Sequence, residues 1–406
     1  MKIGLFVLAA LCISLNSFGQ YGSTDTLSYA SKYFKDRRIL KISLPEEYAD
    51  NPNRSYQVIY LFDAQSEALY NFTKATLSFF PGYASFYFDP VILVGIETKN
   101  RHFEFLPKHI NTAPGPKNYA QAGGADTLAL SIENELKPLI EKKYRTNGYA
   151  IGIGHSLGGT FVTYTMLKYP KIFNAGICIS PNYVFDNEAI LKTLSNPKNK
   201  NFLSSKFLYI AYGNTDEMEE NFRKSTMKFG ELLKKSKIPS LFYKIDPLNN
   251  TSHSTTPMEG IFKGLIFIND FMNLPYEKYK SFLSDTSKQN FVDYVKQYFK
   301  TKSSQTGLLL PSVGELNLIA YNAFYPGKKN EAIQILEWAI SLYPDDPNLF
   351  DSMGEIQEKS GNIDKAEYYY QKGLSIAESQ KAELSETTYK SKIDWFQKRL
   401  AKLEKK

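Results

Sequence analysis

One run, YAIGIGHSLGG at residues 149–159, constrains this chain more than any other feature. A short apolar strand leads into Gly-His-Ser-Leu-Gly, and a helix-like segment follows at residues 160–168. This order is typical of a nucleophile elbow, a sharp strand-to-helix turn that exposes a serine hydroxyl. Gly154 and Gly158 lack the Cβ atoms that would clash where strand and helix converge. The run therefore predicts Ser156 as a nucleophile; the alternative is a tight βα turn with an ordinary serine.

A serine nucleophile needs backbone N–H groups that stabilise the oxyanion formed during the reaction. Leu157 would present its N–H at a helix N-terminus, where negative charge is stabilised. The second N–H usually comes from the loop after an earlier strand. The strand-like run at residues 57–62 is followed by Asp63, Ala64 and Gln65. We expect the backbone of Ala64 or Gln65 to donate, while Asp63 braces the loop.

The base that activates the serine follows by elimination. The chain has four histidines, and the expected chain order is Ser, acid, His. His102 and His109 precede the serine, and His155 lies beside it inside the elbow. His253 is in the right order, in a polar loop between the last strand and a helix. We therefore expect His253 to be the general base; the alternative is a solvated loop histidine.

The acid that orients the base should follow an intervening strand. The strand-like run at residues 207–211 continues into a Gly213-Asn214 turn, and Asp216 is the first carboxylate beyond it. Asp216 would hold the tautomer of His253 and stabilise the imidazolium. Three other carboxylates are alternatives: Glu217, Glu220 and Asp246. A further possibility is that the acidic residues here only stabilise the start of the next helix.

Alternating strands and helices define the first large domain, which we place at residues 24–275. Several of the strands are apolar without alternation, as expected when both faces of a sheet are covered. The expected strands are residues 39–44, 57–62, 91–96, 149–153, 175–179, 207–211 and 240–245. The expected helices are residues 126–144, 160–169, 221–235 and 260–272. This alternation predicts a three-layer α/β domain with a mainly parallel sheet.

The C-terminal part changes character. Residues 276–312 have no strand pattern and read as a helical connector. Residues 313–380 then repeat small residues with a 34-residue period: Gly327 and Gly361, then Ala332 and Ala366. That period is typical of tetratricopeptide repeats, whose paired helices touch at small residues. We expect two such repeats, with residues 381–406 as a capping helix; a plain helical bundle is the alternative.

The N-terminus has the layout of a secretory signal at residues 1–19. Lys2 gives a positive start, and residues 3–15 form an apolar stretch too short to span a bilayer. Cleavage would leave Cys178 as the only cysteine, so the mature chain cannot form an internal disulfide. We expect an exported protein, periplasmic or secreted, with no stable membrane span after cleavage; an uncleaved anchor is the alternative. The sequence has no clustered basic stripe of the kind that binds nucleic acid. It also has so few His and Cys residues that we expect no zinc site.

Several separate segments resemble the family named Putative esterase, which includes esterase D, enterochelin and bacillibactin esterases, feruloyl esterases and mycolyltransferases. The matching pieces spread over about 230 residues: RILKISLP at 38–45, YLFD at 60–63, VGI at 94–96, ELKPLI at 135–140, GHSLGG at 154–159, ISP at 179–181, the Gly-x-x-acid at 213–216, and His253. The resemblance implies an α/β-hydrolase fold, a triad of Ser156, Asp216 and His253, and ester hydrolysis without a cofactor. Ala64 stands where many relatives have glycine.

These observations together predict an exported serine esterase that cleaves carboxylic esters through an acyl-enzyme. Acyl transfer to a sugar or lipid hydroxyl would use the same residues. Possible substrates include siderophore, sugar and phenolic esters. An aromatic-rich stretch at residues 70–88 could line a cleft for them or simply pack the core. The alternative from another class is an adaptor, in which the helical repeats bind a protein partner and the α/β domain is a scaffold.

Overall fold

The structure, a computed structural model, describes residues 22, 24–79, 88–110, 119–283 and 290–405. Its centre is an eight-stranded sheet in the order β1-β2-β4-β3-β5-β6-β7-β8. The strands are β1 (Thr24–Ser31), β2 (Asp36–Ser43), β3 (Tyr56–Phe62), β4 (Val91–Ile96), β5 (Thr146–His155), β6 (Ala175–Ile179), β7 (Phe207–Tyr212) and β8 (Phe242–Pro247). β2 runs antiparallel to both of its neighbours, β1 and β4. The remaining neighbours, in the order β4-β3-β5-β6-β7-β8, all pair in parallel.

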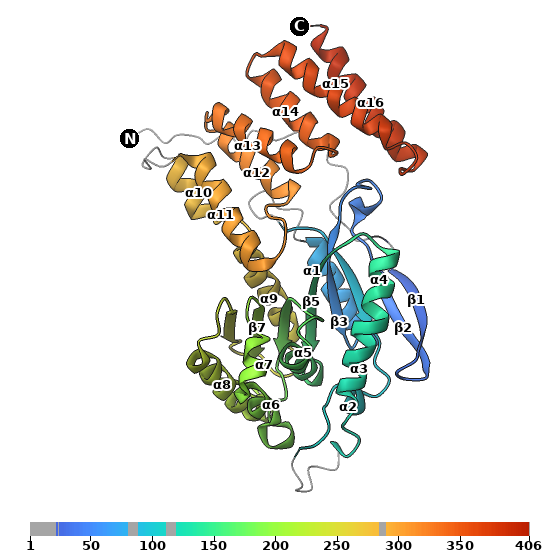
Figure 1. The fold of residues 1–406 in the computed structure, drawn as a ribbon, viewed down its shortest axis with the longest axis vertical. Coiled ribbons are helices and arrows are strands. Elements are labelled where there is room, and N and C mark those ends of the chain that lie inside the picture. Colours follow the sequence, from blue (N-terminus) through green and yellow to red (C-terminus); the bar gives the residue numbers. More distant parts are fainter. Residues whose placement is uncertain (1–21, 23, 80–87, 111–118, 284–289, 406) are drawn as a thin grey trace.

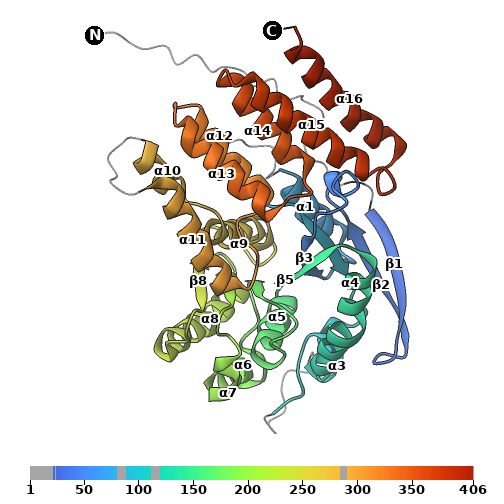
Figure 2. The ribbon, with the colours of Figure 1, turned by 45° about the horizontal axis from the view of Figure 1, so that its top comes forward.

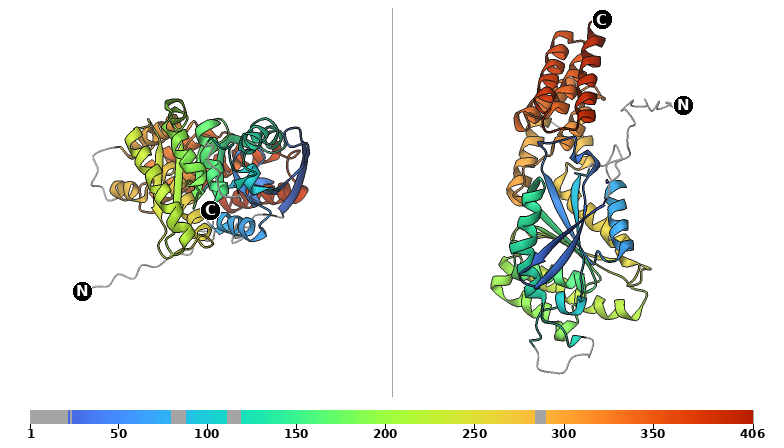
Figure 3. Two further views of the ribbon diagram at one scale, coloured as in Figure 1. Left: turned by 90° about the horizontal axis from the view of Figure 1, so that it is seen from below. Right: turned by 90° about the vertical axis from the view of Figure 1, so that its right-hand side faces the viewer.

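Helices cover both faces of the sheet, so the domain has three layers (Figure 1). They are α1 (Glu67–Phe79), α2 (Arg101–Glu104), α3 (Ala125–Ser131), α4 (Lys137–Lys143), α5 (Leu157–Lys168), α6 (Phe185–Ser195), α7 (Pro197–Asn201), α8 (Glu217–Ser236) and α9 (Thr256–Met272). In the right-hand view of Figure 3, α1 lies on one side of the strands, and α3 and α4 lie on the other. The predicted three-layer α/β class is therefore confirmed.

Alternation within β3 shows how the sequence builds the two cores. Ile59 and Leu61 belong to the apolar cluster on the α1 and α9 face. Val58, Tyr60 and Phe62 belong to the cluster on the opposite face, with α3, α4 and α5. Successive side chains of a strand point to opposite faces, so a strand buried on both sides is apolar at every position. This is why the central strands were recognisable from apolar runs.

The strand predictions hold best in the centre of the sheet. β4 and β6 have the expected bounds, and the other predicted strands shift by one to three residues at their ends. The exception at the edge is β1, which no prediction covered. It pairs with β2 over its whole length but has exposed residues along most of its first half. A polar edge strand has little apolar signal, so its pairing is set by tertiary contact rather than by pattern.

Beyond α9 the chain is helical. The helices are α10 (Tyr276–Leu283), α11 (Phe291–Thr306), α12 (Val313–Phe324), α13 (Lys329–Leu342), α14 (Pro347–Lys359), α15 (Ile363–Ser379) and α16 (Glu386–Leu403). The α12–α13 and α14–α15 pairs start 347 − 313 = 34 and 363 − 329 = 34 residues apart, with Gly327 and Gly361 at positive φ in their turns. This matches the predicted period; the assignment as tetratricopeptide repeats, and the domain limits, stay predictions.

The helical region packs against the end of the sheet where the parallel strands begin (Figure 2). Thr388 on α16 donates to Asp50, just before β3, at 2.8 Å. A cavity of about 460 Å³ lies at this junction, and its lining includes Gln57 from the start of β3 and Gln380 after α15. The carboxyl ends of the strands, where the elbow lies, are at the opposite end of the sheet.

Two predicted features lie wholly or partly outside the described residues. The expected signal at residues 1–19 and part of the aromatic-rich stretch, residues 80–87, lie outside them. Within the rest of that stretch, Tyr70 and Phe88 are buried in the sheet's core. In the described ranges no helix is both long and apolar enough to cross a membrane.

Candidate active site

The predicted elbow is present between β5 and α5. Ser156 has φ 57° and ψ −121°, a conformation that few residues other than glycine adopt. Its N–H donates to the carbonyl of Ile179 on β6 at 2.8 Å, which anchors the turn to the sheet. A Cβ on Gly154 would lie 2.2 Å from the carbonyl carbon of Gly158, so only glycine allows strand and helix to approach this closely. Backbone strain of this kind is concentrated at functional sites.

His253 is brought to the elbow by the loop between β8 and α9. The ring centroids of His253 and His155, the residue before Ser156, are 4.5 Å apart. The side chain of His253 is mostly buried, and its Nδ1 lies 2.6 Å from Oε1 of Glu219. A carboxylate on Nδ1 leaves Nε2 as the nitrogen available to a nucleophile.

Glu219 lies in the first turn of α8 and is completely buried. Its Oε2 accepts the N–H of Gly213 at 2.6 Å. Burial by itself would raise the pKa of Glu219, but hydrogen bonds from His253, Ser180 and Gly213 outweigh it and hold the pKa below its usual value. The carboxylate is therefore ionised at neutral pH and suited to orienting an imidazole.

The acid prediction needs a correction. Asp216 is the N-cap of α8, and its two carboxylate oxygens accept the backbone N–H groups of Glu219 (2.8 Å) and His253 (2.6 Å). It contacts the main chain of His253, whereas Glu219 contacts the ring. The physical reason is helical geometry: the cap residue stays at the helix end, and the third residue of the helix is turned toward the sheet.

The three alternative acids are also placed away from the imidazole. Glu217 is exposed at the start of α8. Glu220 is exposed and pairs with Lys224, one turn further along α8. Asp246 on β8 accepts from the hydroxyl of Tyr209 at 2.7 Å and pairs with Lys244. The structure therefore brings none of these three carboxylates to the ring of His253, where it places Glu219 instead.

The oxyanion loop after β3 resolves the choice between Ala64 and Gln65. The N–H of Ala64 donates to the carbonyl of Ile96 at 3.1 Å, which extends the pairing of β3 with β4 and uses up that donor. The geometry therefore favours Gln65 over Ala64 as the second donor. Among the described residues, the backbone N–H groups of Gln65 and of Leu157 form no hydrogen bond with the protein. These two donors fit the predicted oxyanion hole.

Asp63 braces this loop, as the sequence suggested. It is buried, with φ 63°, and its Oδ1 accepts from Arg101 Nε at 2.8 Å and from Gln65 Nε2 at 2.9 Å. The other oxygen of Asp63 lies 3.5 Å from where a Cβ of Gly158 would stand, beside the elbow helix. The carboxylate thereby braces the oxyanion loop against Arg101 and lies beside the elbow helix.

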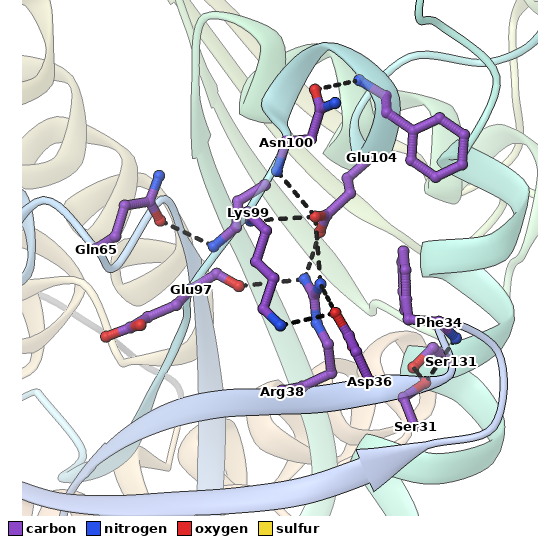
Figure 4. Close-up of polar contacts among 12 residues, drawn as sticks. Ser31, Phe34, Asp36, Arg38, Gln65, Glu97, Lys99, Asn100, Glu104 and Ser131 are labelled. Atoms are coloured by element: carbon purple, nitrogen blue, oxygen red, sulfur yellow. Dashed lines mark hydrogen bonds and ion pairs between the residues drawn. The ribbon is translucent and has the colours of Figure 1, made fainter.

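A second network holds the same loop from the β4 side (Figure 4). The Oε1 of Gln65 accepts the N–H of Thr98 at 2.9 Å. Further along, the buried Glu104 accepts the backbone N–H groups of Lys99 and Asn100, both at 3.1 Å, and pairs with the buried Arg38 of β2. An ion pair buried with its hydrogen bonds satisfied fixes one geometry for the segment that carries Thr98 and Arg101.

Sequence reasoning missed Glu219. The available signal was the spacing Asp-x-x-Glu at residues 216–219, which is typical of a helix start with a cap and an acid at the third position. Here the acid does not return to the cap residue but turns to the base. The contact between the rings of His155 and His253 was also not predicted, since the sequence shows only that His155 precedes Ser156. The described residues hold no cluster of His, Cys, Asp or Glu suited to a metal ion.

Comparisons with known proteins agree with this geometry. Residues 31–211, which include the elbow and the oxyanion loop, match the family described as Putative esterase. The predicted resemblance to that family is therefore confirmed for this segment. A relative named ferri-bacillibactin esterase BesA, from Bacillus subtilis (strain 168), is 31% identical over 169 residues, 39% of this chain. The alignment spans 58% of that relative's length.

Solved structures share the fold. An IroE-like serine hydrolase from Shewanella oneidensis matches all of its length to 79% of this chain, with a TM-score of 0.65 and 21% identity. An uncharacterised protein from Capnocytophaga ochracea DSM 7271 matches 95% of this chain and all of its own, with a TM-score of 0.59 and 16% identity. The α/β domain is thus of the hydrolase fold. Glu219 and His253 lie beyond the family match, so their assignment rests on geometry.

Proposed function

We propose that this protein is a serine esterase that hydrolyses carboxylic esters through Ser156, His253 and Glu219. The observation that carries the proposal is the imidazole of His253, held by a buried carboxylate on one side and lying against the elbow on the other. The nucleophile lies in the turn after β5, the base in the loop after β8, and the orienting acid in the first turn of α8, which follows β7. Active sites of open α/β sheets form at this edge.

In the proposed reaction, Nε2 of His253 takes the proton of Ser156 as Oγ attacks the ester carbonyl. The N–H groups of Leu157 and Gln65 stabilise the negative oxygen of the tetrahedral intermediate. His253 then gives its proton to the leaving alcohol, and an acyl-Ser156 ester remains. Water, deprotonated by the same imidazole, attacks this ester and releases the acid, which regenerates the serine.

We expect the hydrogen bond between Ser156 Oγ and His253 Nε2 to form when substrate binds. In the described residues these two side chains are not hydrogen-bonded to each other. Catalytic hydrogen bonds of this kind commonly tighten only in the complex with substrate. The neighbouring ring of His155 already keeps His253 at the elbow, so the required movement is local.

The substrate class we propose is a siderophore ester. The support is the family of residues 31–211 and the name of the relative BesA, a ferri-bacillibactin esterase. We also propose that the protein is exported and that residues 1–19 are removed as a signal peptide. Acyl transfer would use the same three residues and differ only in the acceptor. The helical region lies at the other end of the sheet, where it would bind a protein partner without covering the elbow.

The test is ester turnover with short-chain nitrophenyl esters, followed by a panel of siderophore, feruloyl and acetyl-sugar esters. Wild type should be labelled at Ser156 by a fluorophosphonate probe, and Ser156→Ala and His253→Ala should each lose several orders of magnitude in kcat. Ser254→Ala, a neighbouring loop serine, serves as the control and should keep wild-type activity. Turnover in Ser156→Ala equal to wild type would remove the assignment.

A further inference from the structure

The main chain of His253 is held on both sides, which the triad itself does not require. Its N–H donates to Oδ2 of Asp216 at 2.6 Å. Its carbonyl oxygen accepts from Nε2 of His155 at 2.8 Å and from the hydroxyl of Thr256 at 3.1 Å. A loop residue whose N–H and C=O are both bonded to side chains from other segments has lost most of its freedom to move.

The contact from His155 links the base to the strand that carries the nucleophile. His155 is the last residue of β5 and immediately precedes Ser156. A carbonyl oxygen only accepts, so Nε2 of His155 must carry the hydrogen. Burial, and then the neighbouring His253, lower the pKa of His155 to about 3, so this ring stays neutral at neutral pH. Its free lone pair is then on Nδ1, and the low pKa makes that nitrogen too weak a base to compete for the proton of the serine.

The contact from Asp216 links the base to the helix that carries the acid. One carboxylate accepts two N–H groups: that of Glu219 on Oδ1 and that of His253 on Oδ2. The separation between the main chains of acid and base is therefore set by the width of a single carboxylate. This contact is independent of His155, since it reaches the opposite side of the residue.

We propose that His155 and Asp216 are positioning residues that fix the catalytic base through its main chain. His155 sets the distance of His253 from the elbow, and Asp216 sets its distance from Glu219. Neither side chain touches the reacting atoms. Displacement of a catalytic group by about 1 Å costs on the order of 10²-fold in rate, so a loop held only by the Nδ1 contact would lose much of its efficiency. This inference rests on the proposed function.

The first test replaces His155 by Phe, which keeps a ring beside His253 but removes the donor, and by Gln, which keeps an N–H at similar reach. Active enzyme is counted by fluorophosphonate labelling, so that kcat refers to folded sites only. His155→Phe should lower kcat about tenfold to a hundredfold with KM unchanged. His155→Gln should recover most of that loss.

The second test replaces Asp216 by Ala, with Ser385→Ala as the matched control. Ser385 is the N-cap of α16 and accepts the N–H of Thr388, so its loss removes a helix cap far from the base. Asp216→Ala should lower kcat per active site and weaken the far-downfield proton signal of the hydrogen bond between His253 and Glu219. Ser385→Ala should change neither.

The outcomes separate this inference from the proposed function. If wild type neither turns over esters nor reacts with the fluorophosphonate, the proposed function fails. If wild type does both, but His155→Phe and Asp216→Ala keep the wild-type kcat per active site, the positioning role is overturned. If His155→Gln is as impaired as His155→Phe, the donated hydrogen bond is not what matters, and the inference is equally wrong for His155.

Discussion

Glu219 Oε1 lies 2.6 Å from His253 Nδ1, although the two residues are 34 positions apart in the chain. The carboxylate is fully buried, and its second oxygen is occupied by the N–H of Gly213. A buried acid that is ionised and fully hydrogen-bonded can hold one tautomer of the imidazole and stabilise the cation formed during proton transfer. This pair fixes the direction in which Nε2 of His253 points.

Replacing Glu219 by Gln should therefore lower kcat by about 10³–10⁴-fold, because the amide cannot stabilise the imidazolium and favours the wrong tautomer. Glu217→Gln and Glu220→Gln change equally acidic residues of the same helix turn that face solvent, and both should keep wild-type rates. The measurement is steady-state hydrolysis of a nitrophenyl ester by protein whose folding is checked by circular dichroism. A large loss in Glu217→Gln, with Glu219→Gln active, would reverse the assignment.

The elbow makes a prediction about stability as well as activity. Gly154→Ala would place a methyl carbon 2.2 Å from the carbonyl carbon of Gly158 and 2.3 Å from its oxygen. Backbone atoms cannot move aside cheaply, so the free energy of unfolding should fall by about 3 kcal/mol and ester turnover should be lost. Gly22→Ala, whose new Cβ meets nothing within 4 Å, should change neither. Denaturant unfolding of both variants gives the comparison, and a stable, active Gly154→Ala would contradict the elbow geometry.

The side chain of Gln65 gives a way to test the oxyanion loop, whose backbone donor cannot be removed directly. Gln65→Leu keeps the N–H but loses the bonds to Asp63 and to the N–H of Thr98. A loosened donor stabilises the transition state less, so kcat should fall at least about tenfold while KM stays unchanged. Gln121→Leu, an exposed neighbour bonded to Asn100, is the control and should behave as wild type. A rise in KM alone would show that Gln65 serves substrate binding instead.

The features that could be predicted from the sequence are those whose signal lies within one short, continuous segment. The elbow was predictable because strand, Gly-x-Ser-x-Gly and helix are contiguous, and His253 because few histidines exist. Glu219 could not be chosen from the sequence, because several acidic residues stand side by side there. Which of them faces His253 depends on where α8 begins, and the Asp216 cap determines that start. The choice between Ala64 and Gln65 could not be made from the sequence either, because the bond from the N–H of Ala64 to Ile96 joins segments that are distant in the chain.

Glu315 connects the two parts of the chain and should give the protein an unusual pH dependence. It is buried near the start of α12, and its Oε1 accepts the N–H of Leu274, just after α9, at 2.8 Å. Burial raises the pKa of Glu315 from its ordinary value of 4.5 to about 8. The carboxyl group is therefore protonated in the folded protein at neutral pH and ionised in the unfolded chain.

The sign of the effect follows from proton counting. Below about pH 4.5 the group is protonated in both states, so its contribution to stability is complete. Between pH 4.5 and about 8 only the folded state holds the proton, and the free energy of unfolding falls as pH rises, by at most about 1.4 kcal/mol per unit. Glu315→Gln, which mimics the neutral acid and keeps the acceptor for Leu274, should remove this fall and be more stable than wild type at pH 8. Urea unfolding of wild type, Glu315→Gln and the exposed control Glu378→Gln at several pH values measures it; a wild-type slope unchanged in Glu315→Gln would exclude Glu315 as its source.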